Sequence, residues 1–127
     1  MADEQLLAKL WEVIQSRRGD TTGYVGELLQ DPFKLRHKVI QEAYEVLEAH
    51  QARLTRLENN VVEDAEGQTS FGARRHVAAE AVDVLIHLYI LLASIDVTPD
   101  DVYEVLERRH AYWAAQDVAG AAQPVAG

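Results

Sequence analysis

The stretch from Ala73 to Ser94 constrains the fold more than any other part of the sequence. It is apolar over most of its length, so we expect a long helix that is buried on most sides. Glu80, Asp83 and His87 nevertheless interrupt the apolar run. Because burying a lone carboxylate is costly, these acids need either a polar partner or a cation. Other helices must surround this one.

Helical periodicity continues through the rest of the chain. Apolar residues recur at spacings of three and four, with polar residues between them. Asp31 before Pro32 and Thr98 before Pro99 each resemble a helix cap followed by proline in the first turn. The predicted helices cover residues 3–17, 24–30, 32–57, 73–94 and 99–116, the last of them ending between 113 and 116.

These elements predict one all-α domain. No segment alternates polar and apolar residues over the length of a strand, and no internal repeat is present. We expect a bundle of four to five helices over residues 1–117. Residues 58–72, which contain two Asn, two Gly and several acids, are predicted to be a loop insertion, and residues 118–127 to be a disordered tail.

The charge balance excludes several functions. The chain has 12 Lys and Arg residues and 21 Asp and Glu residues, which give a net charge of -9. That excess of acid argues against a nucleic-acid or anionic-membrane surface, and a phosphorylated substrate would need a bridging cation. The absence of cysteine excludes disulfides, thiolate catalysis and Cys-ligated zinc. With no leader segment, and with His87 and Asp96 interrupting the apolar stretches, we expect a soluble cytoplasmic protein.

Two pairs of acids lie on the two long predicted helices. Glu42 and Glu45 are three residues apart, as are Glu80 and Asp83. Residues three apart on a helix point to the same side, so each pair presents its carboxylates together. Hard oxygen ligands of this kind suit Mg²⁺, which keeps some waters and takes substrate phosphates as further ligands. The pattern indicates a candidate Mg²⁺ site.

Simpler explanations exist for each of these residues. Single acid pairs occur by chance in many helices. Lys38 precedes Glu42 by four residues and is, taken alone, an ion-pair partner. His87 follows Asp83 by four residues and is, taken alone, a hydrogen-bonded core residue. Residue patterns by themselves therefore predict only a helical protein with a candidate cation site.

Five segments form a longer pattern in one order along the chain. They are LWEVIQSRR at 10–18, GYVGELL at 23–29, KVIQEAYEV at 38–46, AAEAVDVLIHL at 78–88 and residues 101–110. Together they resemble the phosphoribosyl-ATP pyrophosphohydrolases from about Leu6 to His110. The acid pairs are shared with the wider all-α nucleotide pyrophosphohydrolases, including MazG-type enzymes and dimeric dUTPases. His87, the Gly23-Tyr24 segment and the closing Glu-Arg-Arg-His favour the histidine-pathway family.

The resemblance implies a reaction and a set of site residues. The family hydrolyses the α–β phosphoanhydride of phosphoribosyl-ATP to phosphoribosyl-AMP and pyrophosphate, the second step of histidine biosynthesis. Such folds normally dimerise, so we expect a homodimer or a higher homo-oligomer. Carried over by position, the catalytic residues and ligands of Mg²⁺ (or Mn²⁺) would be Glu42, Glu45, Glu80 and Asp83. The residues that would bind substrate are Lys38, His87, Arg74 and Arg75.

Two departures from the family pattern keep other functions open. Gln41 stands where the family usually has Glu, and 34 residues separate Glu45 from Glu80, more than the family usually inserts. One alternative is a MazG-like or dUTPase-like enzyme that hydrolyses nucleoside triphosphates. Another is a non-catalytic helical dimerisation module whose acids are only ion-paired.

Overall fold

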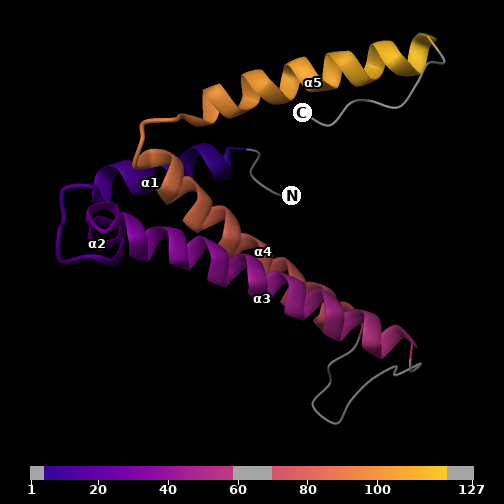
Figure 1. Ribbon diagram of the computed structural model, residues 1–127, viewed down its shortest axis with the longest axis horizontal. Coiled ribbons are helices and arrows are strands. Elements are labelled where there is room, and N and C mark those ends of the chain that lie inside the picture. The colour runs from indigo at the N-terminus through magenta and orange to yellow at the C-terminus, as the bar shows by residue number, and fades with distance from the viewer. Residues whose placement is uncertain (1–4, 59–69, 120–127) are drawn as a thin grey trace. The chain divides into compact units, whose positions relative to one another are not determined.

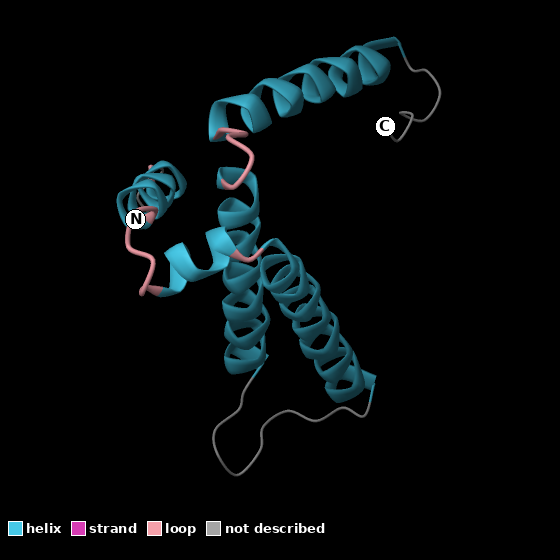
Figure 2. Ribbon diagram, turned by 60° about the vertical axis from the view of Figure 1, so that its left-hand side comes forward, coloured by secondary structure: helices cyan, strands magenta, loops and turns pink. Residues whose placement is uncertain are grey.

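The computed structural model describes residues 5–58 and 70–119. This part of the chain forms five α-helices and contains no strand, which confirms the all-α prediction (Figures 1 and 2). The chain divides into two units between Ile95 and Asp96, and each is described by itself. The helices are α1 (Leu6–Arg17), α2 (Tyr24–Gln30), α3 (Pro32–Glu58), α4 (Ser70–Ala93) and α5 (Pro99–Ala119).

The two long helices α3 and α4 form the framework of the first unit. They run antiparallel and lie side by side, and they contact each other more extensively than any other pair of helices (Figure 1). The short helices α1 and α2 pack where α3 begins and α4 ends. The apolar core collects at this end of the α3–α4 pair, and it includes Ile14, Leu28, Leu35 and Ile90.

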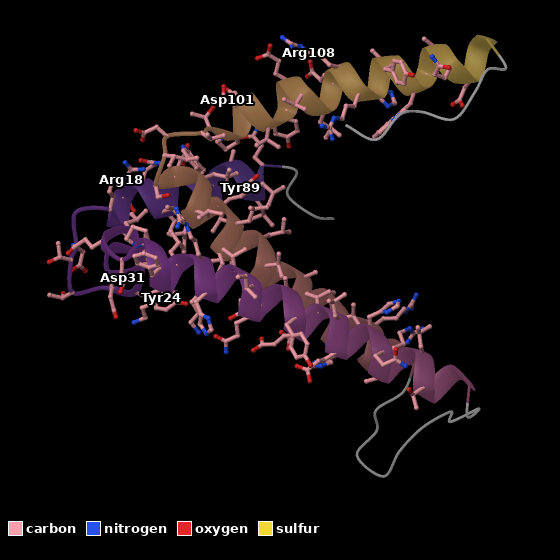
Figure 3. The ribbon with its side chains drawn as sticks, viewed as in Figure 1. Arg18, Tyr24, Asp31, Tyr89, Asp101 and Arg108 are labelled. Atoms are coloured by element: carbon pink, nitrogen blue, oxygen red, sulfur yellow. The ribbon has the colours of Figure 1, made fainter. Side chains whose placement is uncertain are left out.

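Several contacts hold α1 against α4. The ring of Trp11 meets Tyr89 edge to face, with centroids 6.3 Å apart. Arg18, just after α1, donates a hydrogen bond to the carbonyl oxygen of Ala93 at the end of α4 (Figure 3). The last carbonyls of a helix have no partner within it, so this arginine both satisfies one of them and complements the helix dipole.

The predicted caps are present. Asp31 accepts a hydrogen bond from the backbone N–H of Lys34 at 3.0 Å and so caps α3. In the second unit, Asp101 N–H donates to Thr98 Oγ1 at 3.2 Å, and Thr98 N–H donates to the Asp101 carboxylate at 2.9 Å. This reciprocal pair is a capping box at the start of α5.

One face of α5 is rich in large apolar side chains. Val102, Val105, Leu106 and Trp113 are all exposed and line a cavity of about 460 Å³ along this helix. Arg108 forms an ion pair with Glu104 one turn earlier (Figure 3). Exposed pairs of this spacing contribute only about 0.3–0.5 kcal/mol.

Some predicted boundaries differ from the structure. α4 begins at Ser70 rather than Ala73, so the predicted insertion 58–72 contains helical residues at both ends, and 59–69 lie outside the described part. α5 extends to Ala119 instead of ending between 113 and 116, which corrects the start of the predicted tail. No helix breaker occurs before Gly120, and the alanines after Trp113 favour helix. Residues 120–127 lie outside the description.

One stretch of α4, Arg74–Ala93, is long and apolar enough to cross a membrane by length and composition. From the sequence, we expected His87 and Asp96 to interrupt the apolar stretches too much for one of them to span a membrane. The core helix of a soluble protein passes the same test, and α4 packs against α1, α2 and α3 in the first unit. Only 22% of this stretch is buried, however, and Val82 and Leu85 are exposed. The prediction of a helix buried on most sides is therefore wrong, because the helices that pack on α4 within the first unit leave much of its surface uncovered.

A glycine in α2 allows the loop after α1 to approach closely. A Cβ atom added at Gly26 would lie 1.9 Å from the carbonyl oxygen of Asp20, whereas a Cβ at Gly19 would meet nothing within 4 Å. We expect Gly26→Ala to lower the free energy of unfolding by about 1–3 kcal/mol, because backbone must move to admit the methyl group. Urea unfolding followed by circular dichroism measures this.

The matched control is Gly19→Ala, which we expect to change stability by less than about 0.5 kcal/mol. Equal effects of the two substitutions would contradict the close approach of Asp20 to α2.

Candidate active site

Four carboxylates meet between α3 and α4. Glu42 and Glu45 lie one turn apart on α3, and Glu80 and Asp83 lie one turn apart on α4. Carboxylate oxygens of Glu42, Glu80 and Asp83 lie within 4.8 Å of one another. Glu45 interacts with both Glu42 and Glu80. The antiparallel packing of the two helices thus brings together acids that are about 40 residues apart in the sequence.

Burial and mutual repulsion make this cluster electrostatically unfavourable. Glu42 is only 8% exposed, and burial, followed by the neighbouring Glu45, raises the pKa of its carboxyl. Burial also raises the pKa of Glu80, and Glu45 adds to that effect. One oxygen of Glu80, Oε2, is buried and has no hydrogen-bond donor among the described residues. Attraction to His87 and His76 lowers the pKa of Glu42 and Glu80 respectively, but it offsets only part of these effects.

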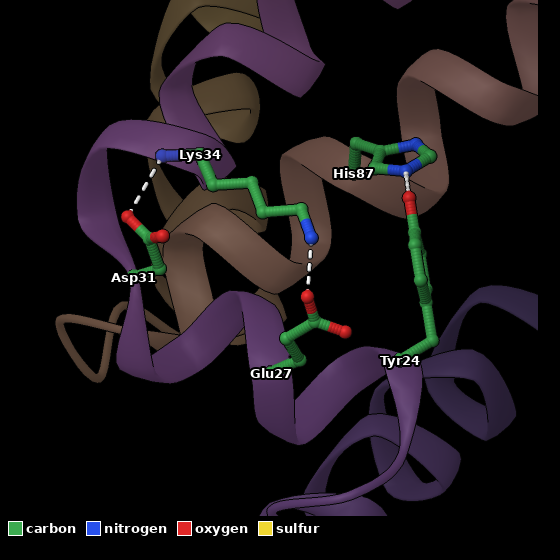
Figure 4. Close-up of polar contacts among 5 residues, drawn as sticks. All are labelled: Tyr24, Glu27, Asp31, Lys34 and His87. Carbon is green, nitrogen blue, oxygen red and sulfur yellow. Dashed lines mark hydrogen bonds and ion pairs between the residues drawn. The ribbon is translucent and has the colours of Figure 1, made fainter.

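A tyrosine from α2 reaches the edge of the cluster. The Tyr24 hydroxyl lies 2.6 Å from Nε2 of His87, and Nδ1 of His87 lies 2.7 Å from the backbone oxygen of Asp83 (Figure 4). A carbonyl oxygen only accepts, so Nδ1 carries a hydrogen. In the neutral ring Nε2 then accepts from the Tyr24 hydroxyl. Burial and the nearby carboxylate of Glu42 raise the pKa of Tyr24, which keeps this hydroxyl protonated.

An ion pair stabilises the junction that presents Tyr24. Lys34, in the first turn of α3, contacts the carboxylate of Glu27 on α2, and its backbone N–H is bound by Asp31 (Figure 4). The hydrogen bond to Glu27 raises the pKa of Lys34. Because both side chains are substantially exposed, the pair fixes geometry more than it adds stability.

The structure brings some of the predicted substrate-binding residues near the acids. Lys38 is half-buried, lies one turn before Glu42 on α3, and makes no hydrogen bond or ion pair with the described residues. His87 is buried and uses both ring nitrogens within the protein. Arg74 and Arg75 are exposed in the first two turns of α4. Their roles toward a substrate stay predictions.

Two residues near the site qualify the sequence argument. Gln41, the residue that departs from the family pattern, is exposed on α3 next to the buried Glu42. Tyr24 lies in a segment that resembles the family, but the sequence pattern did not assign it to the site. Its contact with His87 spans 63 positions, so no local spacing on one helix signals it.

The donor set fits a hard divalent cation. Three carboxylates within 4.8 Å offer oxygen ligands, and the orphaned Oε2 of Glu80 marks an acceptor that needs a positive partner. Oxygen-only ligation suits Mg²⁺ or Mn²⁺. Glu42, Glu80 and Asp83 are the residues placed to hold such an ion, with Glu45 beside them.

Two acid pairs that face each other across antiparallel helices place this protein in the class of all-α nucleotide pyrophosphohydrolases. The family model of phosphoribosyl-ATP pyrophosphohydrolase matches residues 7–110. The chain belongs to that family. The matched region contains all four acids, Tyr24 and His87.

Individual relatives include phosphoribosyl-ATP pyrophosphatases and a bifunctional histidine biosynthesis protein. The chain is 30% identical over 118 residues to a phosphoribosyl-ATP pyrophosphatase of Cereibacter sphaeroides, covering 91% of this chain and 96% of the relative. It is 29% identical over 109 residues to that of Geobacter sulfurreducens, covering 84% and 83%. It is 30% identical over 92 residues to the histidine biosynthesis bifunctional protein HisIE of Thermus thermophilus, covering 69% of this chain and 42% of that protein. No solved structure matched significantly.

The raised pKa values predict how stability depends on pH when no metal is bound. The folded chain binds protons at Glu42 and Glu80 more tightly than the unfolded chain, whose carboxyls titrate near 4.5. Stability therefore falls as pH rises from about 4.5 through the raised values, and the loss persists above them. In EDTA, we expect Glu80→Gln to raise Tm at pH 7.5 and to reduce the fall between pH 5 and 7.5.

The control is Glu12→Gln, which removes an exposed acid of α1 outside the cluster. Thermal unfolding by circular dichroism at both pH values makes the comparison. A lower Tm for Glu80→Gln than for wild type at pH 7.5 would show that Glu80 is satisfied in the folded protein and would contradict the repulsion.

Proposed function

We propose that this protein hydrolyses the α–β phosphoanhydride of phosphoribosyl-ATP, releasing pyrophosphate and phosphoribosyl-AMP. The family match over most of the chain supports the substrate. The observation that carries the chemistry is the four-carboxylate cluster with an orphaned buried oxygen on Glu80. Because the substrate is a nucleotide, we expect the enzyme to act in the cytoplasm.

The proposed cofactor is Mg²⁺, with Mn²⁺ as a substitute, held by Glu42, Glu80 and Asp83, with Glu45 beside them. When bound, the ion neutralises phosphate charge and lowers the pKa of a coordinated water. An acidic cluster repels a triphosphate by itself, and this explains why the proposal requires a cation.

The protein's own residues contribute position and charge. Glu42 is buried on α3, so little of its carboxylate faces bulk water. The proposed role of Lys38, which is half-buried one turn earlier on α3, is to supply an ammonium group that contacts a phosphate. Both ring nitrogens of His87 are hydrogen-bonded, Nε2 to the Tyr24 hydroxyl and Nδ1 to the backbone oxygen of Asp83. A substrate could contact Nε2 only by replacing the hydrogen bond from Tyr24.

Pyrophosphate release tests the proposal. The pure protein is incubated with phosphoribosyl-ATP and, in parallel, with dUTP, dCTP and ATP, each with Mg²⁺ or with EDTA. We expect metal-dependent release from phosphoribosyl-ATP. Asp83→Asn should reduce kcat/KM on the order of 100-fold or more, the loss typical of removing one electrostatic contact to a transition state. Glu12→Gln should retain wild-type activity.

The other outcomes separate the alternatives. Preference for a nucleoside triphosphate would support a MazG-like or dUTPase-like enzyme, as Gln41 and the long span between the acid pairs suggest. No release from any nucleotide, together with no Mn²⁺ binding by calorimetry, would support a non-catalytic dimerisation module. Wild-type turnover by Asp83→Asn would remove Asp83 from the site.

We also propose that a second copy of the chain covers the outer face of α3. Ile40, Tyr44, Leu47 and Leu54 are spaced by four, three and seven residues, and all are exposed, Ile40 by 67% and Leu47 by 64%. Apolar residues at alternating spacings of three and four form a seam for another helix. A groove of about 590 Å³ runs along this seam and is lined in part by Tyr44, Leu47 and Gln51.

A charged substitution tests this interface. We expect Leu47→Lys to convert the homodimer into a monomer, because an ammonium group would be buried at the centre of the seam. Sedimentation velocity at several concentrations measures the change. Ala8→Lys adds the same charge at an exposed position of α1 and should leave the dimer intact. A wild-type monomer, or a dimer that survives Leu47→Lys, would contradict the proposed interface.

A further inference from the structure

A cavity of about 370 Å³ lies within the first unit between α1, α2 and α4. Its accessible walls are mostly apolar, with Leu10 and Val13 from α1 and Ile86 from α4, and the buried core residues Ile14 and Ile90 lie beneath them. A concave apolar site of this volume is typical of a small-molecule pocket and large enough for a heterocyclic ring with part of a sugar. The carboxylate chemistry described above does not use it.

The cavity is adjacent to the acidic cluster. Tyr24 lines the cavity, and its hydroxyl bonds to His87, whose other nitrogen bonds to the backbone of Asp83. On α4, Ile86 follows Asp83 by three residues, or roughly 5 Å along the helix axis. That offset is the distance over which a sugar joins a phosphate to a base. A nucleotide with its phosphates at the acids therefore has a pocket within reach of its base.

The rim of the cavity carries one hydrogen-bond acceptor suited to the edge of a base, the carboxylate of Asp20. Asp20 Oδ1 accepts hydrogen bonds from the N–H and hydroxyl of Thr22, at 3.1 and 2.8 Å. These bonds lower the pKa of Asp20, so its carboxylate stays ionised and Oδ2 remains an acceptor. Gly23 keeps that oxygen uncovered, because a Cβ there would approach Oδ2 to 3.0 Å. An acceptor at this place matches the amino group of adenine.

We propose that this cavity binds the purine ring of the nucleotide substrate. The apolar walls from α1 and α4 contact the faces of the ring, the ring of Tyr24 borders it, and Asp20 accepts from its amino group. The inference rests on the proposed function for the placement of the phosphates at the acidic cluster. It assigns substrate recognition to α1 and α2, which contribute none of the four acids.

Substitutions that fill the cavity test the inference through ligand binding, without a measurement of turnover. Val13 is 42% exposed, so Val13→Phe and Val13→Trp enlarge a wall residue without replacing a buried core side chain. With Mg²⁺ present, AMP, UMP and ribose 5-phosphate are titrated into each protein by calorimetry. For wild type we expect AMP to bind about tenfold or more tightly than ribose 5-phosphate, the discrimination that a pocket contact provides.

We expect Val13→Phe to weaken AMP binding and Val13→Trp to weaken it further, by about tenfold or more, with ribose 5-phosphate unaffected. Ala8→Trp, on the same helix outside the cavity, should bind AMP like wild type. AMP affinity unchanged by Val13→Trp would overturn the inference. So would a wild-type protein that binds AMP no better than ribose 5-phosphate or UMP.

Turnover separates this inference from the proposed function. The protein could bind AMP selectively, lose that binding in Val13→Trp, and still release no pyrophosphate. That result would support the pocket and contradict the proposed hydrolysis. Pyrophosphate release with the same KM in wild type and Val13→Trp would preserve the hydrolysis and overturn the pocket.

Discussion

The candidate site depends on the packing of α3 against α4, which brings four carboxylates together. Glu42 and Glu80 lie where burial and neighbouring acids both oppose ionisation, and Oε2 of Glu80 is buried without a donor among the described residues. Such an arrangement costs stability, because like charges in a partly desolvated space repel. Side chains that a fold keeps in this state are typical of a functional site. The rigid pairing of α3 and α4 holds the acids close together against their repulsion.

The rest of the first unit supports that pairing at one end. The core around Ile14 and Ile90, the Trp11–Tyr89 contact and the bond from Arg18 to Ala93 attach α1 to the end of α4. α2 contributes Tyr24, which reaches His87 one turn beyond Asp83. The two short helices thus fix one boundary of the acidic cluster and enclose the cavity beside it. The acids themselves lie near the middle of α3 and α4, and the core lies beside them, toward the start of α3 and the end of α4.

Local rules predicted the helices and the acid pairs. The three-residue spacing within each pair is a property of one helix, and Asp31 and Thr98 cap their helices as expected because caps depend on a few neighbouring atoms. The end of α5 was placed too early, because Ala114, Ala115 and Ala119 favour helix and no helix breaker stands before Gly120. Tyr24 was missed as a site residue, because its partner lies on another helix and no periodic pattern links the two.

The sequence by itself determined that the chain is all-α, that each long helix carries two acids on one face, and that the chain resembles a nucleotide pyrophosphohydrolase. Helical periodicity and short motifs are local, so they can be read without coordinates. Tertiary structure alone decided that Glu42, Glu80 and Asp83 lie within 4.8 Å of one another, that His87 bonds Tyr24, and that a cavity adjoins the acids. Those facts depend on how helices distant in sequence pack, because distances between side chains on different helices follow from the packing of the core.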